Sequence, residues 1–413
     1  MKMVNKICVV GLGYIGLPTA AIFAGKGIDV VGVDTRKDLV EAVNQGRPHF
    51  GEPNLDTLVR RVVEDKKLRA TMTPEQADAF LIAVPTPFKG DKQPDLSYIE
   101  AAATSIAPML EKGNLVILES TSPIGATEMM TNLLATLRKD LTFPTQLGEL
   151  SDIRIAHCPE RVLPGRILEE VVNNARIIGG MTRKCAQQAV SLYKIVVEGE
   201  CHVTNARTAE LAKLTENAYR DVNIAFANEL SVICDKFGIN VWEMIRMANL
   251  HPRVNILTPG PGVGGHCIAV DPWFIVDSAP EEARLIRNAR IINDEKPLYV
   301  VKKIEAKARS LVDPVIALFG LAYKPDVDDL RESPAVHIVE MLAQRKAGKL
   351  LVVEPHVSEL PAELKLDNVT LMDFDIALAQ ANLAVLLVDH SAFLHVDRDV
   401  LKDKFVIDTR GVW

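Results

Sequence analysis

Residues 6–16 read KICVVGLGYIG, and this segment decides the fold of the chain. Its first five residues are rich in β-branched side chains and predict a strand. The glycines at 11, 13 and 16 then lead into a helical run that ends near residue 24. A second strand is predicted over 28–33, directly before Asp34. This order is that of the βαβ unit that begins a doubly wound parallel sheet: a strand, a G-x-G-x-x-G turn, a helix and a second strand followed by an acidic residue.

The glycine turn and Asp34 together predict a dinucleotide site. The glycines permit a tight turn and let a pyrophosphate approach the backbone at the helix N-terminus, while the acid bonds the ribose hydroxyls. Asp34 favours NAD, because a 2′-phosphate would meet its negative charge, although Arg36 nearby leaves NADP open. The alternative is a glycine-rich turn that binds no ligand.

Three further strands, predicted over 79–84, 115–119 and 153–156, each end in polar or proline-rich residues. These ends read PTP at 85–87, ESTSP at 119–123 and HCPER at 157–161. Because ligands of doubly wound sheets collect at the carboxyl ends of strands, we expect the three ends to line one crevice. Ordinary loop chemistry is the alternative, and Thr86 or Ser122 alone would not exclude it.

The longest helical pattern runs over 205–237 without proline or glycine, about 50 Å at the rise of an α-helix. It predicts a spine that joins two domains and buries one side against a second subunit. Lys213, Asn217 and Arg220 share one stripe of this helix, a set suited to an anionic or polar ligand. A solvated helix face is the alternative.

Residues 259–272 read PGPGVGGHCIAVDP and present Cys267 directly behind a glycine-rich loop. Such a loop exposes its thiol, as a nucleophile requires. Asp271 follows, but Pro272 disfavours helical backbone at Asp271, so no continuous helix from Cys267 is predicted. A tight turn before an ordinary buried cysteine is the alternative.

The C-terminal part returns to α/β alternation after two helical patterns over 284–293 and 298–310. Strands are predicted over 315–319, 349–353, 383–388 and 405–407, with a helix over 334–347. The first turn of this second nucleotide-type sheet, 320–325, lacks the dinucleotide fingerprint. The chain is therefore predicted to be α/β, with two Rossmann-like doubly wound domains joined by a central helical domain with a long spine helix. The expected boundaries are 1–204, 205–310 and 311–413.

Composition limits the classes of partner. A net charge of −7 argues against nucleic acid or an anionic membrane surface as the main partner. The six cysteines form no C-x-x-C pair and no zinc spacing, so a reducing compartment and no metal are expected. The apolar run 7–24 imitates a signal peptide, but its glycine spacing is explained by the dinucleotide turn. We expect a cytoplasmic protein without membrane insertion.

These motifs together resemble the UDP-glucose/UDP-N-acetylmannosamine 6-dehydrogenase family over essentially the whole chain. The residues that carry the resemblance are Gly11–Gly16 with Asp34, Pro85-Thr86-Pro87, Ser120-Thr121-Ser122-Pro123, Pro159-Glu160-Arg161, Lys213 with Asn217, Gly264-Gly265-His266-Cys267 with Asp271, and Lys324 with Asp329, Arg331, Glu332 and Ser333. Pro164 and Val270 stand where the UDP-glucose branch usually has glutamate and lysine. The chain is therefore most similar to the N-acetylmannosamine branch, and no second catalytic glutamate is assigned.

The resemblance implies a four-electron, NAD-dependent oxidation of a UDP-sugar, most similar to UDP-N-acetyl-D-mannosamine, to its uronate. Cys267 would form a thiohemiacetal and then a thioester, and either Asp271 or Glu160 would activate the water that releases the acid. The product would serve bacterial surface polysaccharide synthesis of the enterobacterial common antigen type. A homodimer through the central helical domain is expected.

The family's roles fall on three sets of residues in this sequence. The catalytic set is Cys267, Lys213, Asn217, Asp271, Glu160 and Thr121. NAD would be held by Gly11, Gly13, Tyr14, Ile15, Gly16, Asp34, Thr86, Thr127 and Arg331. The nucleotide sugar would contact Arg161, Val162, Lys213, Asn217, Arg220, His251, Arg253, Gly264, Tyr323 and Lys324, with Arg253 reaching across a dimer.

Alternative functions follow from the same scaffold. The same chemistry could act on UDP-N-acetylglucosamine, UDP-N-acetylgalactosamine or UDP-glucose. A two-electron β-hydroxyacid dehydrogenase would also have the N-terminal fold and a lysine–asparagine pair, but would need neither Cys267 nor a third domain. A non-catalytic nucleotide sensor would not need Cys267, Lys213 and Asp271.

Overall fold

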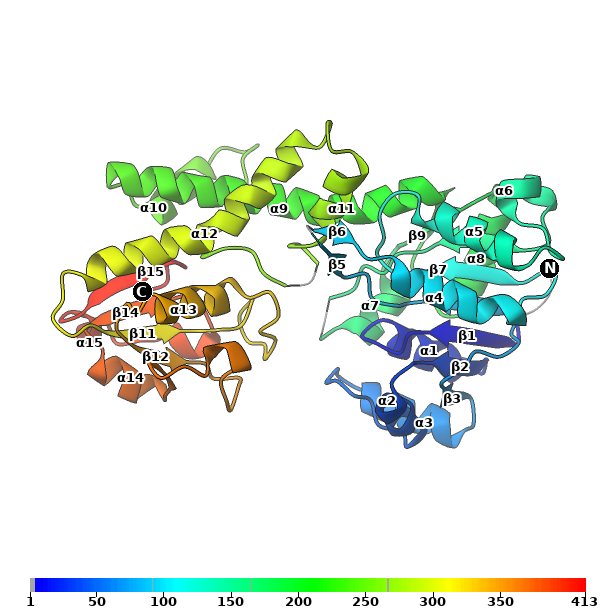
Figure 1. Ribbon diagram of the computed structural model, residues 1–413, viewed down its shortest axis with the longest axis horizontal. Helices are drawn as coiled ribbons and strands as arrows, with labels where there is room; N and C mark the ends of the chain where they lie inside the picture. The colour runs from blue at the N-terminus through cyan, green and yellow to red at the C-terminus, as the bar shows by residue number, and fades with distance from the viewer. Residues whose placement is uncertain (1–3, 91, 164, 266) are drawn as a thin grey trace. The chain divides into compact units, whose positions relative to one another are not determined.

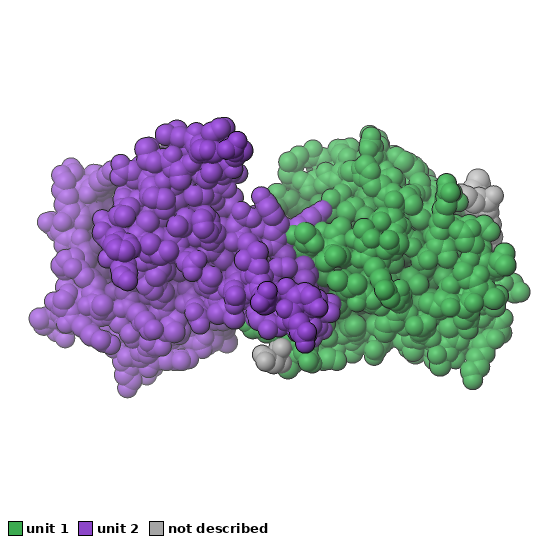
Figure 2. Space-filling model, turned by 90° about the horizontal axis from the view of Figure 1, so that it is seen from above, with its two compact units in different colours: residues 1–215 green, residues 216–413 purple. Residues whose placement is uncertain are grey.

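The computed structural model describes residues 4–90, 92–163, 165–265 and 267–413, and two compact units divide the chain. Unit 1 comprises Met1–Thr215 and unit 2 comprises Glu216–Trp413 (Figure 2). The boundary falls inside helix α9 (Ala206–Phe237), which matches the spine predicted over 205–237. None of the described helices combines the length and apolar character that a membrane span requires.

Among the described residues, unit 1 is built on an eight-stranded sheet with the order β10-β9-β8-β7-β4-β1-β2-β3 (Figure 1). Neighbouring strands are parallel except for β8 and β9. The strands are β1 (Lys6–Val10), β2 (Asp29–Val33), β3 (Leu68–Thr71), β4 (Ala79–Ile82), β7 (Leu115–Leu118), β8 (Arg154–His157), β9 (Arg176–Gly180) and β10 (Cys201–Asn205). A small antiparallel hairpin pairs β5 (Phe88–Lys89) with β6 (Gln93–Pro94).

Alternation along the strands places helices on both faces of this sheet. Ile7 and Val9 of β1 belong to one core cluster with α1, α3 and α8, whereas Cys8 and Val10 belong to another with α4 and α5. The helices of unit 1 before α9 are α1 (Gly16–Gly25), α2 (Lys37–Asn44), α3 (Leu55–Glu64), α4 (Ser97–Ile106), α5 (Ala126–Leu137), α6 (Pro144–Leu147), α7 (Ile167–Asn173) and α8 (Arg183–Tyr193). The predicted doubly wound architecture is confirmed.

Unit 2 contains a helical part and a second, five-stranded parallel sheet with the order β13-β12-β11-β14-β15. Its strands are β11 (Val315–Phe319), β12 (Lys349–Val353), β13 (Val369–Leu371), β14 (Leu383–Leu386) and β15 (Phe405–Asp408). Its helices after α9 are α10 (Val241–Ala248), α11 (Asp271–Ser278), α12 (Arg284–Ala308), α13 (Pro334–Gln344), α14 (Phe374–Gln380) and α15 (Arg398–Leu401). Helices α12 and α13 pack on one face and α14 on the other.

One local expectation was wrong, at a proline. The helices predicted over 284–293 and 298–310 are one helix, α12, which continues through Pro297. Arg290 and Asn293 of α12 bond Asp221 of α9, with Nη1–Oδ1 and Nδ2–Oδ1 distances of 2.5 and 2.8 Å, so tertiary contacts hold the helix where proline removes a backbone bond. At the second proline, Pro272, the expectation holds: the helix α11 begins at Asp271 and does not include Cys267, with Pro272 in its first turn, where proline is tolerated.

Candidate active site

The dinucleotide turn lies between β1 and α1 as predicted. Gly11 has φ +93° and donates its amide to the Val33 carbonyl at 2.8 Å, which joins the ends of β1 and β2. The next amide, of Leu12, bonds Asp34 Oδ2 at 3.0 Å, and the amide of Arg36 bonds Asp34 Oδ1 at 3.0 Å. Asp34 is thereby fixed beside the turn while it remains partly exposed.

The turn fits a bound dinucleotide. A side chain on Gly16 would collide with the Gly11 carbonyl, whereas nothing lies within 4 Å of a Cβ built on Gly13. The backbone is therefore tightly closed on the side of the helix and open at Gly13, where a phosphate can approach the amides. Ile15 immediately precedes α1, and Tyr14 is 42% exposed with its ring 4.3 Å from that of Phe50.

The three polar strand ends are adjacent, because β4, β7 and β8 are neighbours in the sheet. Thr86 donates its hydroxyl to the Thr121 carbonyl at 2.6 Å, and Ser120 donates to the Val84 carbonyl at 2.7 Å. The ends of β4 and β7 are thus bonded to one another. The sheet therefore places the three ends side by side, as the topology predicted.

Thr127 occupies a different environment from the other NAD candidates. It is fully buried, and its hydroxyl and its amide both donate to Glu210 Oε1, at 2.6 and 2.8 Å. Glu210 Oε2 also accepts from the Gly125 amide at 2.7 Å, so Glu210 caps the first turn of α5. Glu210 was missed in the sequence, where a glutamate within a long helix has no local signal for such a role.

Glu160 belongs to a buried charged cluster at the carboxyl end of β8. Its Oε2 accepts from Arg176 Nη2 at 2.5 Å, and its Oε1 accepts from the Arg161 amide at 2.9 Å. Glu119 Oε1 lies 3.8 Å from Arg176 Nη1 and accepts from the Tyr193 hydroxyl at 2.5 Å. The Arg176 guanidinium also lies over the Tyr193 ring, 4.4 Å from its centroid.

In this cluster the Arg176 guanidinium faces two carboxylates, those of Glu119 and Glu160. Burial raises the pKa of the Glu119 carboxyl to about 7, and Arg176 and Tyr193 offset only part of that rise. Burial also raises the pKa of the Tyr193 hydroxyl. Arg176 was missed in the sequence because it lies in a strand that was not predicted, β9.

Three candidates of unit 1 remain. Arg161 donates from Nη2 to the Ala175 carbonyl, and Val162 is half-buried against the core. Lys213 is half-buried on α9, four residues before Asn217. Pro164, which bore on the choice between branches of the family, lies outside the described residues.

Unit 2 brings together Cys267, Asp271 and Asn217. Cys267 is exposed, so the alternative of a buried cysteine is wrong, and its carbonyl accepts from the Asp271 amide at 2.9 Å. Asp271 begins α11 and is 4% exposed, and its Oδ2 accepts from Asn217 Nδ2 at 2.6 Å. His266, part of the glycine–cysteine motif, lies outside the described residues.

The other candidates of unit 2 lie on several different segments of the chain. Arg220 is exposed on α9, and His251 and Arg253 are exposed after α10, with the Arg253 amide 3.3 Å from His251 Nδ1. Tyr323 and Lys324 follow β11, where the Tyr323 ring packs against Gly265 and its Cβ lies next to Gly264. Arg331 is exposed and pairs with Asp329 at 2.6 Å.

Models of three successive family domains match most of the chain. The NAD binding domain of the UDP-glucose/GDP-mannose dehydrogenase family matches residues 5–197, its central domain matches 207–295 and its UDP binding domain matches 317–413. The chain belongs to the UDP-glucose/GDP-mannose dehydrogenase family. This membership confirms the resemblance, the expected class of NAD-dependent dehydrogenase and the expected cofactor, NAD.

Relatives and solved structures of the UDP-glucose/GDP-mannose dehydrogenase family match over the full length. The NDP-N-acetyl-D-galactosaminuronic acid dehydrogenase of Ralstonia solanacearum is 62% identical over 98% of this chain and 96% of its own length. The UDP-N-acetyl-D-mannosamine dehydrogenase of Campylobacter jejuni is 60% identical over 97% of this chain and 98% of its own. The structure of UDP-D-ManNAc dehydrogenase from Pyrococcus horikoshii has a TM-score of 0.86 and 40% identity, and covers 99% of this chain and 96% of that one.

Proposed function

We propose that the chain oxidises UDP-N-acetyl-D-mannosamine to UDP-N-acetyl-D-mannosaminuronate, a four-electron reaction that consumes two NAD and one water. The observation that carries the proposal is the exposed thiol of Cys267, which follows a glycine loop and precedes the buried, amide-bonded carboxylate of Asp271. An alcohol dehydrogenase that stops at the aldehyde needs no such thiol. We assign residues 1–204 to the NAD domain, 205–310 to the central domain and 311–413 to the UDP-sugar domain.

NAD bound at the Gly11–Gly16 turn supplies the hydride acceptor for both oxidations. Gly11, Gly13 and Gly16 let the pyrophosphate reach the backbone, Tyr14 and Ile15 lie at the same turn, and Asp34 holds the ribose hydroxyls. The proposed NAD set also includes Thr86, Thr127 and Arg331. Thr127 is buried, and its part in this set is through its hydrogen bond to Glu210, which caps α5.

The protein's own residues carry the covalent steps. The Cys267 thiolate adds to the aldehyde carbon to give a thiohemiacetal, and loss of a second hydride leaves a thioester. Lys213 and Asn217 stabilise the negative charge that develops on the sugar oxygen, and Thr121 orients that oxygen. Water then attacks the thioester, which releases the carboxylate and returns the thiol.

We assign activation of that water to Asp271. Both oxygens of Glu160 accept hydrogen bonds, from Arg176 and from the Arg161 amide, which fixes its orientation. The Asp271 amide bonds the Cys267 carbonyl, which keeps its carboxylate within one turn of the thiol. Glu160 instead orients the sugar.

The nucleotide sugar is a dianion, and we assign its binding to Arg161, Arg220, Arg253 and Lys324 with His251 and Tyr323 beside them. Arginine pairs two phosphate oxygens at once, which suits a diphosphate. Val162 and Gly264 border the same ligand, and Gly264 must remain small because a side chain there would meet the Glu332 carbonyl.

The sugar itself is chosen by likeness to relatives. Several relatives at 57–60% identity are named UDP-N-acetyl-D-mannosamine dehydrogenase, including that of Escherichia coli. The relatives named NDP-N-acetyl-D-galactosaminuronic acid dehydrogenase, at 62%, favour N-acetylgalactosamine as the second candidate. A panel of UDP-N-acetylmannosamine, UDP-N-acetylgalactosamine, UDP-N-acetylglucosamine and UDP-glucose, with NADH and uronate both counted, decides between them. Two NADH per sugar with the mannosamine substrate preferred is the expected result, and one NADH with an aldehyde product would refute the four-electron reaction.

Replacement of Cys267 by serine separates the two oxidations. The serine hydroxyl is a much poorer nucleophile than a thiolate, so single-turnover assays should give at most one NADH and a trapped or bound aldehyde. Cys201, which is only partly buried in unit 1, provides a matched control as Cys201→Ser and should leave the yield at two NADH. Uronate formed at the wild-type rate by Cys267→Ser would make Cys267 structural.

We further propose that the protein is cytoplasmic and forms a homodimer that packs through α9. Its product, the uronate, would serve the synthesis of surface polysaccharide of the enterobacterial common antigen type. Tyr219, Phe226 and Ile233 recur every seven residues on α9 and are 68%, 52% and 46% exposed, a stripe suited to an identical helix. Phe226→Asp should halve the mass measured by light scattering. Expression of the wild-type chain should restore the antigen in a bacterium that lacks UDP-N-acetylmannosamine dehydrogenase.

A further inference from the structure

The second sheet repeats the backbone bonds of the dinucleotide turn without its glycine fingerprint. Gly320 has φ +94° and donates its amide to the Val353 carbonyl at 2.8 Å, as Gly11 does to Val33. The next amide, of Leu321, bonds Glu354 Oε2 at 2.7 Å, as Leu12 bonds Asp34. The His356 amide bonds Glu354 Oε1 at 3.0 Å, as Arg36 does with Asp34. Glu354 therefore occupies in unit 2 the position that Asp34 occupies in unit 1.

Glu354 differs from Asp34 in how completely it is bonded. Glu354 is only 5% exposed, and its Oε2 also accepts from the Ala322 amide at 3.0 Å and lies 3.0 Å from His390 Nε2. Burial opposes ionisation, but the hydrogen bonds from His390 and the Leu321 amide outweigh it and hold the pKa of Glu354 below its usual range. A buried carboxylate with four donors cannot serve ribose hydroxyls, so it holds protein backbone instead.

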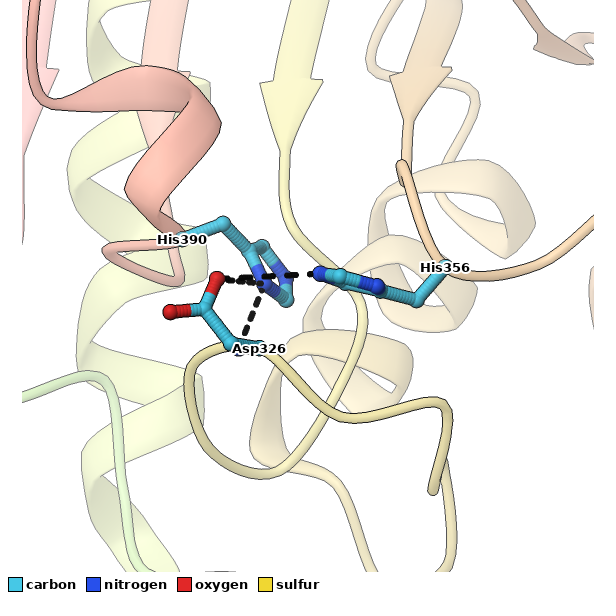
Figure 3. Close-up of side chains that lie close together, drawn as sticks. All are labelled: Asp326, His356 and His390. Atoms are coloured by element: carbon cyan, nitrogen blue, oxygen red, sulfur yellow. Dashed lines mark hydrogen bonds and ion pairs between the residues drawn. The ribbon is translucent and has the colours of Figure 1, made fainter. Parts of the chain in front are cut away.

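His390 bonds the other end of the same loop, residues 321–326. Its Nδ1 accepts from the Asp326 amide at 3.0 Å, so the proton of the neutral ring is on Nε2, which donates to Glu354. Figure 3 shows His390 lying against the turn that carries Asp326. The Asp326 carboxylate is in turn bonded by the amide and hydroxyl of Ser391, at 2.9 and 2.5 Å. Glu354 and His390 together hold the segment 321–326 at both ends.

The same three residues could be interpreted as a metal site, because ligand atoms of Asp326, His356 and His390 lie within 4.8 Å of one another (Figure 3). The hydrogen bonds oppose this interpretation. The Nδ1 lone pair of His390, which would face the ion, already accepts the Asp326 amide. The Asp326 oxygens are bonded by Ser391. A metal would have to break these bonds, so the cluster is better explained as a loop anchor.

The anchored segment reaches the glycine loop before Cys267. Tyr323 lies in the middle of 321–326, and Cβ atoms built on Gly264 and Gly265 would lie 3.0 and 2.9 Å from Tyr323 side-chain atoms. Gly265 also has φ +82°, a conformation that other residues rarely adopt. The glycine loop thus follows the surface of Tyr323 closely, and any shift of Tyr323 moves the backbone that presents Cys267.

We propose that Glu354 and His390 are positioning residues that fix the loop 321–326, and through Tyr323 the glycine loop, for binding of the nucleotide part of the substrate. The proposal rests on the proposed function, because it assigns Tyr323 and Lys324 to that substrate. Neither Glu354 nor His390 touches the reacting atoms. Their loss should therefore weaken UDP and UDP-sugar binding more than it slows the chemical steps.

Two variants of His390 separate its two hydrogen bonds. In His390→Gln the side-chain amide can still donate to Glu354 but lacks the acceptor at Nδ1, whereas in His390→Asn the carbonyl oxygen can take the place of Nδ1. His390→Gln should speed hydrogen exchange at 321–326 and raise the Kd for UDP, each by about tenfold, the effect of one buried hydrogen bond lost. His390→Asn should retain most of the protection at Asp326. His356→Ala is the matched control from the same cluster and should behave as wild type.

The measurements are peptide-resolved hydrogen exchange, calorimetric titration with UDP, and KM for UDP-sugar and for NAD. Exchange and UDP binding need no turnover, so an inactive chain would refute the proposed function without removing this test. All three tryptophans, at 242, 273 and 413, lie in unit 2, so their fluorescence reports whether each variant keeps that unit folded. If His390→Gln does not fold, Glu354→Gln provides the same comparison at Leu321 and Ala322. Three results would each overturn the proposal. The first is a folded His390→Gln variant whose hydrogen exchange and UDP affinity are unchanged. The others are a rise in KM for NAD equal to that for the UDP-sugar, and an effect of His356→Ala equal to that of His390→Gln.

Discussion

Asn217 donates its side-chain amide to the buried carboxylate of Asp271 at 2.6 Å, which joins the middle of α9 to the first residue of α11. The bond fixes two residues of the proposed catalytic set relative to one another. It also orients the Asn217 side chain, because the Nδ2 group faces Asp271 and the Oδ1 atom must point elsewhere. A substitution at Asn217 therefore tests both the orientation of the Asp271 carboxylate and the proposed catalytic role of Asn217.

Asn217→Asp should lower kcat at pH 8 by about 100-fold or more, with a smaller change in KM. Two carboxylates at hydrogen-bond distance can share one proton at low pH, but at pH 8 that proton is lost, the two negative charges repel one another and Asp271 has no donor at residue 217. Activity should recover partly as pH falls toward 6. Asn223→Asp, on the same helix with its amide bonded to the Tyr219 carbonyl, is the control. Equal losses in the two variants would show a general effect of charge on α9.

Asp34→Asn should weaken discrimination against NADP. Removal of the charge lifts the repulsion of a 2′-phosphate, while the remaining amide oxygen can still accept from the Leu12 or the Arg36 amide and keep the turn. The ratio of kcat/KM for NAD to that for NADP should fall by about tenfold, and initial rates with each cofactor measure it. Asp38→Asn is the control. It removes a charge from the same segment, where Asp38 pairs with Arg36 at 2.5 Å. The assignment of Asp34 fails if the ratio is unchanged in Asp34→Asn or shifts equally in the control.

Glu119→Gln should change how stability depends on pH. Because burial raises the pKa of Glu119 to about 7, from 4.5 when exposed, its contribution is fully present below pH 4.5 and is lost as pH rises through 7. The variant, which cannot ionise, should gain about 1–3 kcal/mol relative to wild type between pH 5 and pH 8. Urea unfolding followed by far-ultraviolet circular dichroism at both pH values measures the difference. Glu128→Gln, which loses a partly exposed pair with Arg207, should show no such trend.

Arg253→Lys should raise KM for the UDP-sugar about tenfold and leave KM for NAD unchanged. Arg253 is exposed and lies in the short turn after α10, so substitution should not disturb folding. Lysine keeps the charge but loses the planar fork that pairs two phosphate oxygens. Arg246→Lys on α10 is the control. Equal changes in KM for both substrates would contradict the placement of Arg253 at the diphosphate.

The sequence predicted most of the sheet-forming segments because their signals are local. Three of the predicted strands, at 6–10, 315–319 and 349–353, match β1, β11 and β12 in full, and the spine helix differs by one residue. Strands β9 and β10 were missed because Gly179, Gly180 and the polar residues of β10 give no apolar run. Pro297 predicted a break that the buried bonds of Arg290 and Asn293 prevent.

The sequence by itself determined the chemistry of this protein: a glycine turn with Asp34, a thiol behind a second glycine loop, and polar residues at the ends of strands. These features are encoded within a few residues, because backbone conformation and side-chain reactivity are local. Only the tertiary structure decided the partners, such as Arg176 with Glu160, Asn217 with Asp271 and His390 with Glu354. Those pairs join residues 16, 54 and 36 positions apart, which strand order and helix packing bring together and which no short pattern in the sequence specifies.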